Sequence, residues 1–411
     1  MILKRVAGSF VAIVLCLSIL PGLTIAAEYN VSQSVDFTGP YAVIMKPVDD
    51  TAKALFQWWN DTRGKELGIK LVRKTYETRY DPTVVASLWP SILAGDKPIA
   101  HLGLGGPDIA ALMKRAPNDK VPIFMGTATY GFAWLPDQWI FQSRPTYAHE
   151  LAGFLNWVHM NKIKDRPIKV ASISSKVTPA YVDQINGLEA LTKTIPWIQS
   201  VHVEWVQMNP VSLTSEVRRL ARHEPDFIYI ATNTNHVIGT IRAQNELGIK
   251  IPLILSSHNG VQMCAAAAKD MTILEGHYDT YSCDPATDMN KPAAKIFDEY
   301  AKKLGLDTKW SEVCLIAGTE TIMMLRAVER AAAAVGPDKI TGESIYKAMF
   351  EKPFTEEELL GMLPTQTYTK AAPFSLKDIK VISTTVKDGK QTLVSKEWIP
   401  VPSVPSWVDK K

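Results

Sequence analysis

The strongest constraint on the fold is an alternation of two hydrophobic periods that begins near Tyr29. Short β-rich runs such as IKVASIS (168–174) and DFIYIAT (226–232) alternate with segments such as 151–158, in which apolar residues recur at helical spacing. Strands that alternate with amphipathic helices form parallel sheets covered by helices on both faces. The sequence therefore predicts an α/β protein.

The alternation divides into two series. The first ends near WIFQSRPTYAHE (139–150), and the second begins with the helix after it and the strand IKVASIS. A chain of 411 residues exceeds what one hydrophobic core usually serves, and its 46% hydrophobic content is enough for two. We therefore expect two α/β lobes with a cleft between them, followed by a C-terminal hairpin whose tight turn is KDGK (387–390).

The N-terminal segment 1–26 has the organisation of a secretory signal. Lys4 and Arg5 precede an almost wholly apolar stretch, and Thr24 and Ala26 fit the small residues of a cleavage point. An uncleaved membrane anchor is the alternative, but the apolar core is short for a span of about 20 residues. We expect cleavage after Ala26 and a soluble protein in the periplasm.

Charge and cysteine content exclude several functions. The formal net charge is only +3, and basic and acidic residues are mixed throughout, so no nucleic-acid surface is indicated. Three cysteines follow the signal segment, namely Cys264, Cys283 and Cys314, and none has metal-ligand spacing. A bridge between Cys264 and Cys283 is permitted in an oxidising compartment.

The stretch HLGLGGPDIAALMKRAP (101–117) places three glycines between a short apolar run and a helical pattern. Glycines let backbone N–H groups approach a ligand, and a helix start favours an anion. The stretch matches neither the dinucleotide pattern G-x-G-x-x-G nor the phosphate-loop pattern. A bound anion and a tight turn without ligand both remain open.

Several motifs together resemble a known family. VSQSVDFTGPYAV, YDPTVVASLWPSILAGDKPIAHLGLGGP, VPIFMGTATY, GLEALTKTI and DFIYIATNTN are similar to the periplasmic solute-binding proteins of branched-chain amino-acid-type (Leu/Ile/Val-binding-like) ABC importers, over nearly the whole mature chain. The resemblance implies the type I periplasmic binding fold, with two doubly wound parallel-sheet lobes joined by a hinge. Lobe 1 would comprise 27–146 and 281–365, and lobe 2 would comprise 147–280 and 366–411.

The resemblance also implies the partners and the first half of the ligand site. We expect a monomer that binds a small organic acid or amino acid and delivers it to a membrane permease, without a cofactor or a metal. Loops after the lobe 1 strands would hold the ligand carboxylate through backbone N–H groups and hydroxyls. These positions are Leu104, Gly105, Gly106, Thr127, Ala128 and Thr129, with Thr38 and Tyr41 facing the cleft from the first loop. Thr38 is equally well explained as a helix N-cap.

The second lobe decides the class of ligand. An enclosed α-ammonium needs a carboxylate partner, whereas the loops here offer Asn233, His258 and Asn259. Asp279 is the one nearby acid and is better explained as a turn residue. We therefore expect a carboxylate ligand without an ammonium, with an aromatic ring as one option, because Tyr41, Tyr181 and Tyr278 could enclose a ring.

Three alternatives remain. A branched-chain or other amino acid could be the ligand, and a ligand sensor that feeds a signalling receptor could use the same fold. An enzyme would draw on His101, His258 and His277 at strand ends. However, none of them has a partner at metal-ligand spacing, and no nucleophile elbow G-x-S-x-G is present. We expect no enzymatic activity.

Overall fold

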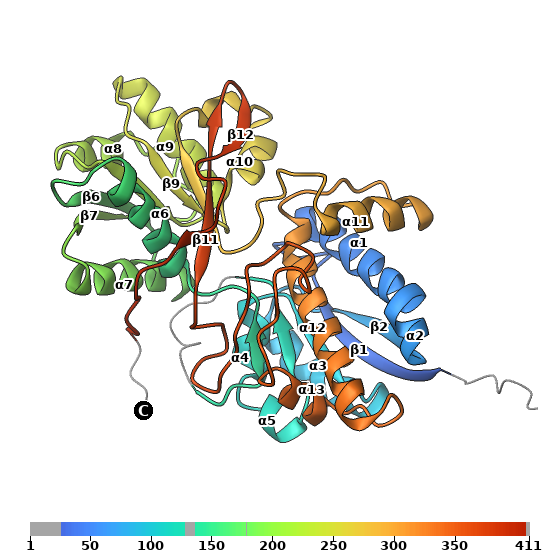
Figure 1. The fold of residues 1–411 in the computed structure, drawn as a ribbon. Helices are drawn as coiled ribbons and strands as arrows, with labels where there is room; N and C mark the ends of the chain where they lie inside the picture. The colour runs from blue at the N-terminus through green and yellow to red at the C-terminus, as the bar shows by residue number, and fades with distance from the viewer. Residues whose placement is uncertain (1–25, 128–135, 178, 408–411) are drawn as a thin grey trace, which may run out of the picture.

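The structure is a computed structural model, and it describes residues 26–127, 136–177 and 179–407. Two lobes lie side by side in Figure 1. One contains the blue, cyan and orange parts of the chain, and the other contains the green and yellow parts with the red hairpin. This is the two-lobe α/β organisation that the alternating pattern predicts.

The first lobe is built on a five-stranded sheet of the described residues, with strand order β2-β1-β3-β4-β5 and every pairing parallel. Its strands are β1 (Ala27–Val35), β2 (Ile69–Glu77), β3 (Ala100–Gly103), β4 (Ile123–Met125) and β5 (Ile140–Gln142). Its helices are α1 (Ala42–Trp59), the π-helical turn η1 (Asn60–Gly64), α2 (Lys65–Leu67), α3 (Pro82–Gly95), α4 (Gly106–Leu112), α5 (Ala116–Asp119), α11 (Pro292–Lys303), α12 (Cys314–Val335) and α13 (Gly342–Ala348).

Successive residues along a strand of this sheet belong to two different hydrophobic cores, one on each face. Phe124 packs in the core formed with α1 and α12, whereas its neighbours Ile123 and Met125 pack in the core formed with α3 and α4. Because successive side chains of a strand point to opposite faces, both faces of the sheet must be covered. This is why the sequence of a strand such as β4 is apolar at every position.

The second lobe is built on an eight-stranded sheet of the described residues, whose main path is β12-β11-β10-β9-β8-β6-β7, with β13 paired to β11. Its strands are β6 (Ile168–Ser174), β7 (Ile198–Trp205), β8 (Phe227–Ala231), β9 (Leu253–Ser256), β10 (Tyr278–Tyr281), β11 (Lys380–Lys387), β12 (Lys390–Leu393) and β13 (Ile399–Pro400). Its helices are α6 (Tyr147–Asn161), α7 (Pro179–Thr194), α8 (Thr214–Ala221), α9 (Thr234–Leu247), α10 (Val261–Ala268) and the 3₁₀ turn η3 (Thr272–Leu274).

The same alternation organises this lobe. Phe227 and Tyr229 pack against α6 and α7, and Ile228 and Ile230 pack against α8, α9 and α10. The hairpin of β11 and β12 extends the sheet in the antiparallel sense. Its turn residues Asp388 and Gly389 have φ angles of 52° and 68°, as a two-residue hairpin turn requires.

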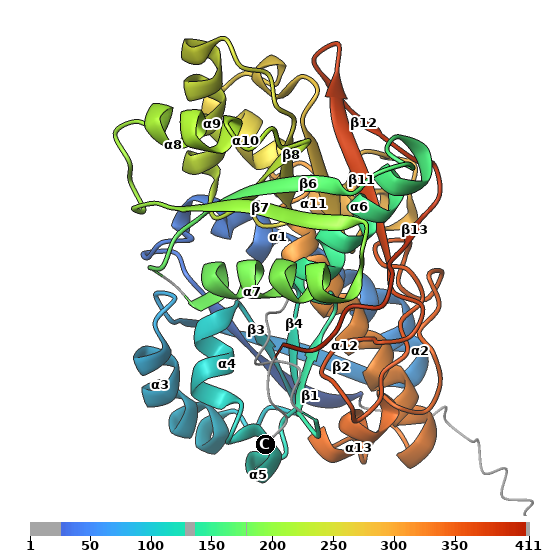
Figure 2. The same cartoon turned by 90° about the vertical axis from the view of Figure 1, so that its left-hand side faces the viewer.

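The chain passes between the two sheets three times. The passages lie between β5 and α6, between β10 and α11, and between α13 and β11. In Figure 2, α7 lies on the side of the second lobe that faces β3 and β4 of the first. The passages and the facing loops position the candidate site.

The sequence left a disulfide bridge open, and the structure excludes it. Cys264, Cys283 and Cys314 are all free and buried. Cys264 belongs to the apolar core of the second lobe, and Cys283 belongs to the core of the first. No helix of the described residues is both long and apolar enough to span a bilayer.

Candidate ligand-binding site

Aromatic side chains from both lobes gather where the lobes face each other. The rings of Tyr41 and Tyr80 lie 4.3 Å apart in the first lobe. Burial raises the pKa of Tyr41 well above its ordinary value, and the neighbouring phenols of Tyr80 and Tyr181 raise it further. Because Tyr181 belongs to α7 of the second lobe, Tyr41 and Tyr181 are neighbours across the gap between the lobes.

The loop after β9 completes this aromatic group. His258 is half-buried, and its ring meets the rings of Tyr181 and Tyr147 edge to face, at centroid distances of 5.8 Å and 6.2 Å. Its Nε2 lies 3.4 Å from the Tyr181 hydroxyl. We call this group, together with the nearby Arg144, the interlobe site: Tyr41, Tyr80, Arg144, Tyr147, Tyr181 and His258.

Burial, followed by the positive charge of Arg144, lowers the pKa of His258 to about 4. His258 is therefore neutral near pH 7, and its ring can donate one hydrogen bond and accept another. Burial also raises the pKa of Tyr147 and of Tyr181. The walls of the interlobe site are therefore uncharged phenols and a neutral imidazole.

Glu150 holds the surrounding backbone in place from the first turn of α6. Its carboxylate accepts hydrogen bonds from the Oγ of Ser257 at 2.8 Å and 2.9 Å and from the Oγ of Ser282 at 3.0 Å. The backbone N–H groups of both serines donate to it as well, at 3.2 Å and 3.3 Å. Glu150 therefore joins α6, the loop after β9 and the passage after β10.

The glycine turn uses its N–H groups internally. The N–H of Leu104 and the N–H of Gly105 donate to Oδ2 of Asp108 at 2.9 Å and 3.1 Å, and Ser34 donates to Oδ1 at 2.5 Å. A carboxylate of the chain therefore already accepts from both donors, and the assignment of Leu104 and Gly105 as ligand contacts stays a prediction that this geometry does not favour. A β-carbon on Gly105 would lie 2.5 Å from the Tyr80 hydroxyl, so the turn packs against the interlobe site.

The other first-lobe candidates lie in different environments. Thr38 is exposed and donates to Oε1 of Glu77 at 3.2 Å, a contact within a surface turn. Gly106 begins α4, and Thr127 is half-buried after β4. Ala128 and Thr129 lie outside the described residues. Among the first-lobe candidates, Tyr41 is therefore the one that interacts with a residue of the second lobe, because the phenol of Tyr181 influences its pKa.

Two of the second-lobe candidates have structural roles. Asn259 is fully buried, and its amide donates to the carbonyls of Ile230 and Thr232, both at 2.9 Å, while its oxygen accepts from the N–H of Ser256 at 2.8 Å. Asn233 precedes α9, and its side-chain oxygen lies 2.8 Å from Nδ1 of His236. Neither amide belongs to the interlobe site.

Tyr278 is at the wrong end of its strand for a cleft residue. It begins β10, packs against Phe154 and Trp157 of α6, and accepts a hydrogen bond from Lys162 at 2.6 Å. The facing loops follow the carboxyl ends of the parallel strands, so a residue at the amino end lies away from them. The expectation that Tyr278 encloses the ligand stays a prediction, and the position of Tyr278 in β10 does not favour it.

Asp279 is also not a turn residue. It is fully buried in β10 and accepts hydrogen bonds from Tyr281, Thr384 and the N–H of Val261. Its carboxylate is therefore already surrounded by donors of its own lobe, which makes it a structural acid.

The histidines considered for catalysis have partners of their own. His101 is buried, with Nδ1 2.9 Å from the Ser32 hydroxyl and Nε2 facing Asp108 at 3.4 Å. Nδ1 of His277 accepts from the N–H of Leu253 at 3.1 Å. Of the three histidines, His258 is the one that belongs to the interlobe site.

Sequence reasoning missed Tyr80, Tyr147 and Arg144. Tyr80 follows the carboxyl end of β2 with a φ of 52°, a conformation that turns the chain sharply. Arg144 and Tyr147 lie in the sequence WIFQSRPTYAHE, at the passage where the first series ends. A charged or aromatic residue directly after a strand, at a lobe boundary, is the signal that could have found them.

A hollow on the surface of the second lobe is not part of this site. It measures about 430 Å³, lies on the second lobe and is bounded by α9 and the turn before β10, including Ile241, Gln244 and His277. It is lined by residues of one lobe alone, whereas the residues of the interlobe site come from both lobes.

The fold is that of an α/β protein with two lobes joined by three passages of the chain. Residues 28–372 match the family model described as periplasmic binding protein, and the chain belongs to this family. The sequence matches none of the curated proteins. Members of the family are extracytoplasmic proteins that bind a substrate.

Solved structures share the fold. A branched-chain amino acid ABC transporter from Thermus thermophilus with bound valine aligns with a TM-score of 0.74 and 16% identity, over 92% of this chain and 97% of that one. A fatty acid ABC transporter substrate-binding protein from Thermomonospora curvata aligns with a TM-score of 0.72 and 19% identity, over 93% and 96%. A substrate-binding protein from Aeropyrum pernix aligns with a TM-score of 0.73 and 17% identity, over 92% and 98%. These likenesses confirm the type I periplasmic binding fold.

Proposed function

We propose that this protein is the extracytoplasmic solute-binding component of an ABC importer and that it captures a small organic acid without an ammonium group in the interlobe site. The observation that carries the proposal is the gathering, beside cationic Arg144, of Tyr41 and Tyr80 of the first lobe and of Tyr147, Tyr181 and His258 of the second. Flat phenol walls suit an aromatic or other apolar body.

The charge balance of the interlobe site favours an acid over an α-amino acid. An enclosed ammonium requires a carboxylate that can still accept hydrogen bonds. The buried carboxylates beside the interlobe site are already engaged: Ser257 and Ser282 donate to both oxygens of Glu150, and the N–H groups of Gly39 and Tyr41 donate to Asp36. An amino acid would therefore leave its ammonium poorly compensated.

The similar structures support both ligand classes. The Thermomonospora curvata protein is described for fatty acids, which carry a carboxylate without an ammonium. The Thermus thermophilus protein is described with bound valine, which favours the alternative of an amino acid. The electrostatics of the interlobe site are the reason to prefer the acid.

Titration calorimetry tests the proposal. The chain from residue 27 onward is titrated with benzoate, hexanoate, leucine and valine. We expect at least one acid to bind and leucine and valine to bind more weakly by a factor of about ten or more, equivalent to about 1.4 kcal/mol. Tight binding of leucine or valine with no binding of either acid would contradict the proposal.

Export of the chain is part of the same proposal. β1 begins at Ala27, whose N–H donates to the carbonyl of Gly68 at 2.8 Å, so cleavage after Ala26 leaves the sheet complete. Mass spectrometry of the protein recovered from the periplasmic fraction should give a chain that begins at Ala27 or Glu28. A chain that retains residues 1–26 would contradict cleavage.

A further inference from the structure

Arg144 is a buried cation in the first passage between the lobes. It is 5% exposed and stands between β5 and Thr146, the N-cap residue of α6. Its Nη1 faces the sulfur of Cys283 at 3.8 Å, and its Nε has no hydrogen-bond partner. A thiol is a weak acceptor, so the hydrogen-bonding capacity of the guanidinium is almost unused in the described part of the chain.

The chain supplies no direct counter-ion. Arg144 forms no ion pair within the described residues, although the buried carboxyl groups of Glu150, Glu312 and Glu320 are close enough to interact with its charge, and Glu150 is held by the two serines. A guanidinium stays protonated under all ordinary conditions. A buried charge without a hydrogen-bonded partner is costly, and a bound anion would offset that cost.

Arg144 is close to the aromatic members of the interlobe site. Its charge contributes to the lowered pKa of His258, after burial, and it opposes the burial that raises the pKa of Tyr147. The planar fork of a guanidinium matches the two oxygens of a carboxylate. The N–H groups of the glycine turn, in contrast, are engaged by Asp108.

We propose that Arg144 binds the acidic end of the ligand and thereby makes the interlobe site selective for monocarboxylates with an aromatic or apolar body. The inference rests on the proposed function and reverses the expected orientation of the guest. The carboxylate lies toward the passages between the lobes, and the apolar body lies between Tyr41 and Tyr181.

The test compares an acid with its uncharged amide in the wild type and in Arg144→Gln. Benzoate and benzamide have the same ring, and hexanoate and hexanamide have the same alkyl chain. We expect the wild type to prefer the acid of at least one pair by a factor of about 100, and Arg144→Gln to lose that preference while amide affinity changes less than about threefold. Removing one partner of a buried charge pair commonly weakens binding by a factor of about 30 or more.

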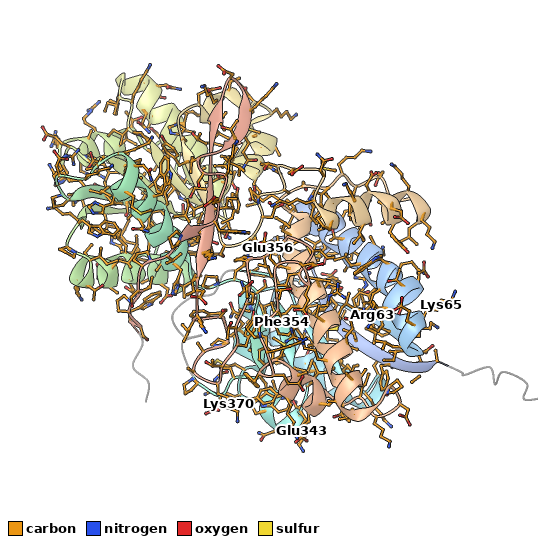
Figure 3. The ribbon with its side chains drawn as sticks, viewed as in Figure 1. Arg63, Lys65, Glu343, Phe354, Glu356 and Lys370 are labelled. Carbon is orange, nitrogen blue, oxygen red and sulfur yellow. The ribbon has the colours of Figure 1, made fainter. Side chains whose placement is uncertain are left out.

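Arg330 provides a matched control. It is also buried, at 7% exposed, but its guanidinium donates to the carbonyls of Lys352 and Pro353 and stacks 3.5 Å from the ring centre of Phe354, which Figure 3 labels in the first lobe. Arg330→Gln should lower the melting temperature without changing the ratio of acid to amide affinity. Arg144→Gln should change the ratio and leave the melting temperature of the ligand-free protein nearly unchanged.

The outcomes separate the two proposals. If the wild type prefers an acid and Arg144→Gln binds it equally well, or loses acid and amide alike, Arg144 does not hold the carboxylate and the inference is wrong. If the wild type binds neither acid, the proposed function fails and the inference fails with it. If Arg144→Gln does not fold, Arg144→Lys decides, because it keeps the charge and loses the fork. It should weaken acid binding about tenfold and leave amide binding unchanged, and an unchanged acid affinity would overturn the assignment.

Discussion

The hydroxyl of Tyr281 lies 2.7 Å from Oε2 of Glu312, within hydrogen-bond distance, and this contact joins the end of β10 in the second lobe to the segment that leads into α12 of the first. The N–H of Glu312 in turn donates to Gln262 of α10 at 2.9 Å. Gly260 leaves the room for this contact, since a β-carbon there would lie 2.1 Å from the Tyr281 hydroxyl. The two lobes are therefore linked by a buried carboxyl group.

This link should respond to pH. Burial, and then the nearby charge of Asp279, raises the pKa of Glu312 to about 8 from its ordinary value of 4.5. The folded state then binds a proton that the unfolded state has released, so stability is greatest below the ordinary value and falls as the pH rises through about 8.

Glu312→Gln removes this titration. Urea unfolding at about pH 6 and about pH 9 should show the wild type losing roughly 1–3 kcal/mol more than the variant, because glutamine keeps a hydrogen-bonding group beside Tyr281 and carries no charge. Parallel losses in the two proteins would show that Glu312 does not titrate in this range.

Glu150 should be a major determinant of stability. In Glu150→Gln an NH₂ group would face the N–H and O–H donors of Ser257 and Ser282, so buried donors would lose their acceptor. We expect a loss of about 2–4 kcal/mol in the free energy of unfolding. Urea titration measures it.

Glu343→Gln is the control for Glu150→Gln. Glu343, labelled in Figure 3, pairs with Lys120 and Lys347 at 3.2 Å on the surface. Exposed pairs contribute little, so this variant should differ from the wild type by less than about 1 kcal/mol. Equal effects of the two substitutions would contradict the role of Glu150.

Tyr181 should control ligand affinity. Tyr181→Ala removes the second-lobe wall opposite Tyr41 and should weaken binding of the best acid by a factor of about 10–100, as expected for a buried aromatic contact. Calorimetry compares it with Tyr278→Phe, which removes only the hydrogen bond from Lys162. An effect of Tyr278→Phe as large as that of Tyr181→Ala would contradict the placement of the ligand.

Two glycines of the first lobe should respond in opposite ways to alanine. A β-carbon on Gly126 would lie 1.6 Å from the carbonyl oxygen of Ile316, so Gly126→Ala forces β4 and α12 apart and should cost about 3 kcal/mol or more. Gly95 ends α3 with open space around it, and Gly95→Ala should raise stability by up to about 1 kcal/mol. Thermal unfolding distinguishes them, and a stable Gly126→Ala protein would contradict the close packing of β4 on α12.

Much of the fold was predictable because its signals are local. The strand and helix periods identified the parallel sheets, and KDGK identified the hairpin of β11 and β12. The hydrogen bond from the glycine turn to Asp108 could also have been predicted, because an acidic residue three positions after Gly105 is typical of helix capping.

The candidate site was harder to predict because its contacts are not local. Asn259 binds carbonyls at Ile230 and Thr232, nearly thirty residues earlier, and nothing in the sequence near Asn259 indicates that its amide is already used. The same holds for Tyr41 and Tyr181, which lie far apart in the sequence and influence each other electrostatically because the passages bring the two lobes together.

The most direct test is a crystal structure of the protein with the acid that binds best in calorimetry. The account predicts that the guest lies between Tyr41 and Tyr181, with carboxylate oxygens at about 3 Å from the guanidinium of Arg144. A guest outside the space between the lobes, or one whose acidic end displaces Asp108 from the N–H groups of Leu104 and Gly105, would contradict it.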